Sequence, residues 1–72
     1  LARGVGGPAE PARARTVLAK ACDGDSSDAC NNLAVMTQLG QGGPADRARA
    51  KTLFEKACKL GNKTACTSAS AL

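Results

Sequence analysis

Apolar residues recur at helical spacing along most of this chain. Ala14, Val17, Leu18 and Ala21 lie at positions i, i+3, i+4 and i+7, which places them on one face of a helix. In the next stretch, from about Asp28 to Leu39, apolar residues occupy nearly every side, so we expect that helix to be sandwiched between neighbours. A short polar turn separates the two stretches, which predicts an antiparallel helical hairpin.

The whole pattern returns after 36 residues without a gap, and 14 of the 36 aligned pairs are identical. Ala50, Leu53, Phe54 and Ala57 reproduce the first helical face, and Thr64 to Leu72 forms a weaker copy of the second helix. A fixed period of this length indicates a solenoid. We therefore predict an all-α fold, an α-solenoid of two helix-turn-helix repeats at 1–36 and 37–72. Because the chain opens with leucine in the middle of a repeat, we expect it to be one fragment of a longer array.

Residues with strong positional preferences mark the expected helix ends. Pro8 and Pro44 suit the first turn of a helix, where a missing N–H has no consequence. Glu10 and Asp46 follow close behind, where the positive end of the helix dipole favours a carboxylate. Gly40 suits a left-handed C-cap of the second helix. The sequence thus predicts first helices that begin near each proline.

Four cysteines repeat with the same period, as Cys22, Cys30, Cys58 and Cys66. An antiparallel hairpin brings the two cysteines of each repeat together, and only pairing within a repeat keeps the symmetry and makes each disulfide local. Other readings remain: a zinc site, a reactive thiol beside a lysine, and buried free cysteines acting as small apolar residues. Zinc is disfavoured because the chain has no histidine and no Cys-x-x-Cys. Disulfides would indicate an oxidising compartment, so we expect a secreted or periplasmic protein.

Composition and charge exclude some classes of binding partner. The net charge is +4, but basic residues alternate with alanine and threonine, and the chain has one aromatic residue, so we expect no nucleic-acid binding. No apolar run approaches the roughly 18 residues of a membrane span, so we expect no membrane partner. Large aliphatic side chains are few, and a core this thin calls for disulfides or neighbouring repeats of the parent chain.

These residues resemble the Sel-1-like repeat family, a relative of the tetratricopeptide repeats, over nearly the whole chain. Matching positions in the second copy are Gly40, Gly42, Asp46, Ala50, Phe54, Ala57, Cys58, Gly61 and Ala65, and in the first copy Gly4, Gly6, Ala14, Leu18, Ala21, Cys22, Ala29, Leu33 and Ala34. The recurring Ala-Cys pairs are similar to the cysteine-rich, secreted Hcp-type branch, in which a disulfide joins the two helices of each repeat. One departure is Asp25 in place of the turn glycine, for which Gly24 is expected to substitute.

The resemblance implies a protein–protein interaction scaffold without cofactor or metal. We expect contacts on the polar face of the first helices, where an Arg-x-x-Thr-x-x-x-Lys stripe recurs and favours a protein or peptide partner of acidic character. Some cysteine-rich members carry a beta-lactamase or penicillin-binding label, but no serine-nucleophile motif and no histidine base occur in this sequence, so we expect no enzyme. A third hypothesis is a purely structural spacer. The stripe comprises Arg13, Thr16, Lys20, Arg49, Thr52 and Lys56.

Overall fold

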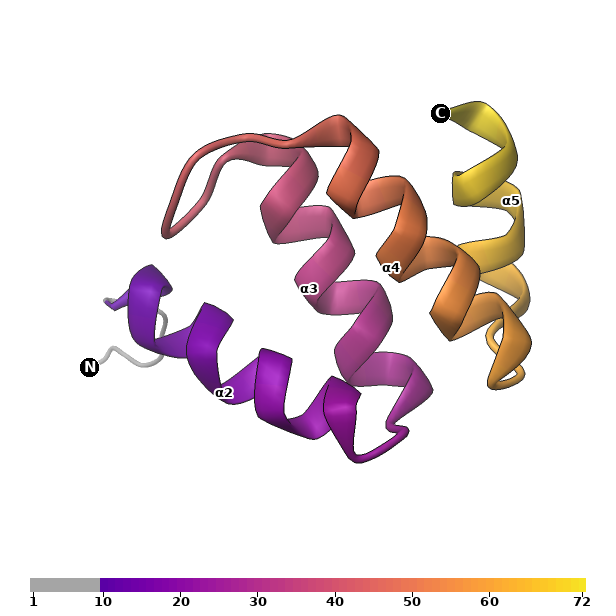
Figure 1. Ribbon diagram of the computed structural model, residues 1–72, viewed down its shortest axis with the longest axis horizontal. Coiled ribbons are helices and arrows are strands. Elements are labelled where there is room, and N and C mark those ends of the chain that lie inside the picture. The colour runs from indigo at the N-terminus through magenta and orange to yellow at the C-terminus, as the bar shows by residue number, and fades with distance from the viewer. Residues whose placement is uncertain (1–9) are drawn as a thin grey trace.

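A computed structural model describes residues 10–72, which form four α-helices and no strand. The helices are α2 (Pro11–Asp23), α3 (Ser27–Leu39), α4 (Arg47–Lys59) and α5 (Lys63–Ala71). They lie side by side in chain order, each antiparallel to the one before it (Figure 1). The predicted all-α pair of helical hairpins is therefore confirmed. The first copy of the glycine-proline segment, which includes Gly4, Gly6 and Pro8, falls outside the described residues.

The first helices begin later than the sequence predicted. Helix α4 starts at Arg47, three residues after Pro44, so the expectation of a proline in its first turn is wrong. Asp46 is instead the N-cap, and its carboxylate accepts a hydrogen bond from the backbone N–H of Arg49 at 3.0 Å. In α2 the first helical residue is Pro11. Glu10 is the N-cap, but its carboxylate accepts no hydrogen bond from the backbone of the helix. The carboxylate of a capping residue accepts a hydrogen bond from one of the first backbone N–H groups of the helix, and a proline side chain has no acceptor that could do so.

The turns that end the helices use left-handed backbone. Gly40 has φ 76° and closes α3 as predicted. Between α2 and α3 it is Asp25 that takes positive φ, at 68°, while Gly24 stays at −84°. The expectation that Gly24 would substitute for the turn glycine is therefore wrong, because aspartate tolerates the left-handed region better than most residues.

The core is narrow and consists mainly of small side chains. Phe54 is its largest member, and α3 lies between α2 and α4 as predicted. Six of the ten buried apolar residues are alanines, which allow helix backbones to approach closely but remove little apolar surface from water. The buried apolar residues are Cys22, Ala29, Cys30, Leu33, Ala34, Ala50, Phe54, Ala57, Ala65 and Ala69.

Two parts of the predicted apolar surface are exposed. On α2, Val17 is 59% exposed and Ala21 is also exposed, because no helix in the described chain covers the side of α2 that faces away from α3. On α3, Val35 and Leu39 are exposed, with Leu39 at 63%, so this helix is not buried all round. Its two neighbours cover only two of its sides.

Each hairpin is closed by a disulfide. Cys22 bonds to Cys30 and Cys58 bonds to Cys66, and in both pairs the Cα atoms lie 4.6 Å apart. None of the cysteines is free in this structure. The longest helices have 13 residues, and within residues 10–72 none has the length and apolar character needed to cross a membrane.

The loop from Gly40 to Asp46 joins the two hairpins and lies against the start of α2. Gly42 has φ 74°, and a Cβ built on it would lie 2.5 Å from the carbonyl oxygen of Pro11. Asp46 N–H donates to the carbonyl oxygen of Thr37 at 2.9 Å, which ties the end of the loop to α3. Glycine is therefore required at position 42 both by backbone conformation and by space.

We expect Gly42→Ala to destabilise the protein more than Gly61→Ala. Gly61 also has positive φ, at 110°, but a Cβ there meets nothing within 4 Å. Its substitution should cost only the backbone strain, about 1–2 kcal/mol. Gly42→Ala adds a clash with backbone, so its cost in the free energy of unfolding should be roughly twice as large. Chemical denaturation followed by circular dichroism measures both values, and equal losses would contradict the close approach.

Candidate functional groove

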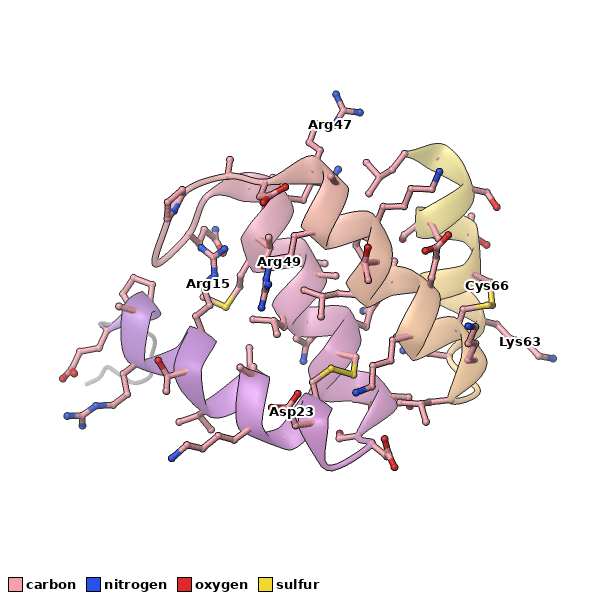
Figure 2. All side chains as sticks on the ribbon, in the orientation of Figure 1. Arg15, Asp23, Arg47, Arg49, Lys63 and Cys66 are labelled. Atoms are coloured by element: carbon pink, nitrogen blue, oxygen red, sulfur yellow. A yellow bond between two sulfur atoms is a disulfide. The ribbon has the colours of Figure 1, made fainter. Side chains whose placement is uncertain are left out.

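A groove of about 290 Å³ crosses the boundary between the two repeats. It lies between α2 and α4, with Leu33 of α3 at its base and Gly42 of the loop at one end. Its polar groups are the guanidinium groups of Arg15 and Arg49 and the hydroxyl group of Thr16, and its remaining lining residues are Ala12 and Ala19. Figure 2 shows Arg49 over α3, and Arg15 between α2 and the connecting loop.

Arg15 is held in place by the loop between the hairpins. Its Nη1 donates to the carbonyl oxygen of Gln41 and its Nη2 to that of Pro44, each at 3.2 Å. Gly43 lies directly against this guanidinium, since a Cβ there would come within 2.6 Å of Nη1. A guanidinium has five N–H donors, so two bonds to carbonyl groups leave donors for a ligand. The loop thus fixes a cation at the edge of the groove.

Arg49 reaches the groove from the first turn of α4. Its backbone is fixed by the Asp46 cap, and its side chain is exposed. Within residues 10–72, Arg13 and Glu10 form an ion pair at 3.4 Å on the outer surface of α2. Arg49 forms no ion pair with the described residues, so its charge is uncompensated there. Two cations from different repeats therefore face one groove with an apolar base.

The structure brings together only part of the predicted stripe. Thr16 and Arg49 line the groove, whereas Arg13 and Lys20 are exposed outside its lining. The hydroxyl groups of Thr16 and Thr52 donate to backbone carbonyl oxygens four residues earlier in their helices, at 3.1 and 3.2 Å. Within residues 10–72 the two stripes are thus not equivalent, because α4 has α2 as a preceding first helix and Arg49 shares a groove with it.

Sequence reasoning missed Arg15 and Leu33. Arg15 aligns with Lys51 across the repeat, so a recurring positive charge was the available signal. Leu33 is a buried residue of the core, and it also forms the base of the groove. Whether a core residue also lines a surface groove depends on how far apart its two neighbouring helices lie.

A second, larger groove of about 580 Å³ lies between α4 and α5. Lysine and glutamate side chains of α4 form one wall, and the Cys58–Cys66 disulfide forms part of the other. Its lining residues are Lys51, Glu55, Cys58, Lys59, Cys66, Ala69 and Ser70.

Two serine side chains form hydrogen bonds with backbone groups of their own helices. Ser26 accepts from the backbone N–H of Ala29 as the N-cap of α3, and Ser70 donates to the carbonyl oxygen of Cys66. Residues 10–72 contain no group of three or more side chains suited to hold a metal ion.

We expect Arg15→Met to lower the free energy of unfolding by about 1 kcal/mol, because it removes two hydrogen bonds from a charged donor on a half-buried side chain. Arg13→Met is the matched control, since it removes an equal charge two residues away and breaks only an exposed ion pair. Arg13→Met should change the free energy of unfolding by less than about 0.5 kcal/mol. Urea denaturation of the two variants checks this, and equal effects would show that the loop does not depend on Arg15.

Comparison with known families agrees with this architecture. The family model described as Sel1 repeat matches residues 27–62, a segment that contains α3, the connecting loop and α4. No curated protein and no solved structure matches the chain. Repeats of this type mediate protein–protein interaction and are non-catalytic scaffolds. Because the match covers half of the chain and the fold is the expected pair of helical hairpins, this protein belongs to the Sel1 repeat family.

Proposed function

We propose that this protein is a scaffold that binds an acidic segment of another protein in the groove between α2 and α4. The observation that carries the proposal is the pair of guanidinium groups, Arg15 and Arg49, that line one groove from two different repeats. Leu33 and the alanines beside it supply an apolar base on which a methylene or methyl group can pack. An acidic side chain flanked by small apolar residues fits both features.

Electrostatics supports the same partner. The chain has a net charge of +4, and the loop holds Arg15 in place before any ligand arrives, so less side-chain entropy is lost on binding. Charges at the surface of a protein mainly increase the rate of association and select partners, and they are screened by salt over about 8–10 Å. Affinity should therefore be modest and should fall as salt is added.

Catalysis is not part of this proposal. A beta-lactamase-like or penicillin-binding activity would need a nucleophile beside a base, and the two serines with side-chain bonds serve as a helix cap and a backbone contact. A purely structural spacer differs from a scaffold only in whether the groove binds a partner, and the peptide experiment below separates the two.

Neighbouring repeats are the second kind of partner that we propose. Ala14, Val17, Leu18 and Ala21 of α2 align with Ala50, Leu53, Phe54 and Ala57 of α4. On α4 this face is buried or half-buried against the helix before it, whereas on α2 Val17 and Ala21 are exposed. The α2 face therefore suits a helix of the same character as α3.

We also propose an oxidising compartment, and with it the secreted, cysteine-rich branch of the family. Both cysteine pairs are oxidised, and disulfides of this kind persist outside the cytosol.

The groove is tested by substituting aligned residues in the two repeats. Arg49→Glu and Arg13→Glu make the same change in charge at the same repeat position, but only Arg49 lines the groove. We expect a fluorescent Glu-Ala-rich peptide to bind the unmodified protein, and Arg49→Glu to weaken this binding about fivefold more than Arg13→Glu, as expected for one exposed charge pair. Fluorescence anisotropy at low salt measures the affinities.

A Lys-Ala-rich peptide of equal length is the control for nonspecific adsorption. Equal losses from the two arginine variants would indicate a general charge effect and reject the groove. No binding of the acidic peptide at millimolar protein would favour the spacer.

The neighbouring-repeat proposal predicts different costs for two aligned substitutions. Leu53→Ser removes a half-buried side chain that packs on the core and should destabilise the protein by about 1–2 kcal/mol. Val17→Ser alters an exposed side chain and should cost less than about 0.5 kcal/mol in this chain. Denaturant titration compares them, and an equal cost would mean that the α2 face is already covered.

A further inference from the structure

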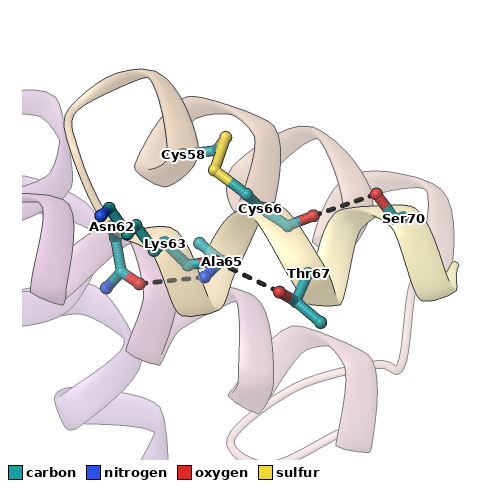
Figure 3. Close-up of a disulfide and its surroundings, with 7 residues drawn as sticks. All are labelled: Cys58, Asn62, Lys63, Ala65, Cys66, Thr67 and Ser70. Carbon is teal, nitrogen blue, oxygen red and sulfur yellow. Dashed lines mark hydrogen bonds between the residues drawn. A yellow bond between two sulfur atoms is a disulfide. The ribbon is translucent and has the colours of Figure 1, made fainter.

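The two disulfides have the same spacing and the same place in their hairpins, but they differ in burial. Cys22 is 2% exposed and Cys30 is 0% exposed. Cys58 and Cys66 are both half-buried and line the 580 Å³ groove between α4 and α5, where Figure 3 shows their bond at the junction of the two helices. The first disulfide therefore belongs to the core and the second to a surface groove.

The residues that open this groove are specific to the second repeat. Leu33 and Ala34, both buried in α3, are replaced by Ala69 and Ser70 in α5. Helix α3 is also covered on its far side by α4, whereas Ser70 of α5 is exposed. The smaller side chain at position 69 leaves space beside the second disulfide that Leu33 takes up in the first repeat.

The charges around the two disulfides differ as well. Lys51 and Lys59 line the second groove, with Glu55 between them on the same helix. At the aligned positions the first hairpin has Arg15, which is bound to loop carbonyls, and Asp23, which follows Cys22 directly. Lysines attract an approaching anion and stabilise a thiolate, while an aspartate does the opposite.

We propose that Cys58–Cys66 is a thiol-exchange site that accepts a small anionic thiol, while Cys22–Cys30 remains a structural disulfide. The proposal is independent of the acidic-segment groove, because the two sites share no residue. It needs one co-reactant, a low-molecular-weight thiol that carries a carboxylate, of which glutathione is the probe used below.

The exchange has two balanced steps. A thiolate attacks Sγ of Cys58, the Cys58–Cys66 bond breaks, and Cys66 leaves as a thiolate. Cys66 is the better leaving group because it lies near the N-terminus of α5, where the helix dipole favours negative charge, whereas Cys58 lies in the last turn of α4. A second thiolate then attacks the sulfur of the bound thiol, which forms the oxidised dimer of the reagent and releases Cys58 as a thiolate. Two reagent thiols are oxidised and one protein disulfide is reduced.

Reduction should release α5 from α4. This helix has only nine residues, its buried residues are the two alanines Ala65 and Ala69, and it packs mainly on α4. Alanine side chains bury little apolar surface, so the covalent bond is a large part of what holds α5 in place. The state of this disulfide would then decide whether the outer face of α4 is covered.

The test is partial reduction of the intact chain. The protein is exposed to increasing reduced glutathione, free thiols are alkylated at timed intervals, and tryptic peptides are analysed by mass spectrometry. Residues 64–72 report Cys66, and residues 21–47 report Cys22 and Cys30 together. We expect Cys66 to be alkylated at least tenfold faster than Cys22 and Cys30, with a loss of helical circular dichroism limited to the equivalent of one short helix. Equal rates, or faster reduction of Cys22–Cys30, would overturn the proposal.

Two controls separate accessibility from general unfolding. In concentrated guanidinium the rate difference should largely disappear, because both disulfides close loops of the same separation. Ala69→Leu restores the side chain found at Leu33 and should slow the alkylation of Cys66 several-fold, whereas Ala71→Leu, on an exposed position of α5, should not. If Ala69→Leu fails to slow exchange relative to Ala71→Leu, the groove is not the route to the disulfide and the proposal is rejected.

Discussion

Covalent closure of each hairpin is the constraint on which this structure depends, because the side chains between the helices are too small to hold them by burial alone. Removing a methylene group from water contributes about 0.8 kcal/mol, and alanine offers only a methyl group. A disulfide across eight residues contributes roughly 2–3 kcal/mol in the chain-entropy model. The alanines still matter, since they let the helices approach until the cysteine Cα atoms lie 4.6 Å apart.

A different set of contacts joins one hairpin to the next. Phe54 and the alanines of α4 pack on α3, and the glycine-rich loop lies across the start of α2. Gly42 and Gly43 are small where the loop meets Pro11 and Arg15, and Arg15 bonds to two carbonyl oxygens of the loop. The Gly42-Gly43 pair is therefore explained by close contact with α2 as well as by turn formation.

The two repeats differ in what lies beside each helix. The groove with Arg15 and Arg49 exists because two first helices, one from each repeat, flank α3 there. The groove beside Cys58–Cys66 is lined by Ala69 and Ser70 of α5, which stand where α3 has Leu33 and Ala34. Aligned residues with the same chemistry thus have different surroundings, which is the basis for both proposals.

The sequence by itself determined the helical hairpins, their order, the left-handed turn at Gly40 and the local pairing of the cysteines, because these follow from periodicity and from contacts between residues close in the chain. It misplaced the helix starts by a few residues, since a proline and a capping carboxylate compete for the same turn and only the hydrogen bond to Arg49 decides between them. It also assigned Val17 and Leu39 to buried faces. Only the tertiary structure decided which copy of an apolar face is covered, that Arg15 and Arg49 line one groove, and that one disulfide is buried while the other is half-buried. Each of these depends on which helices are neighbours in space, and a repeated sequence pattern is the same whether or not a neighbour is present.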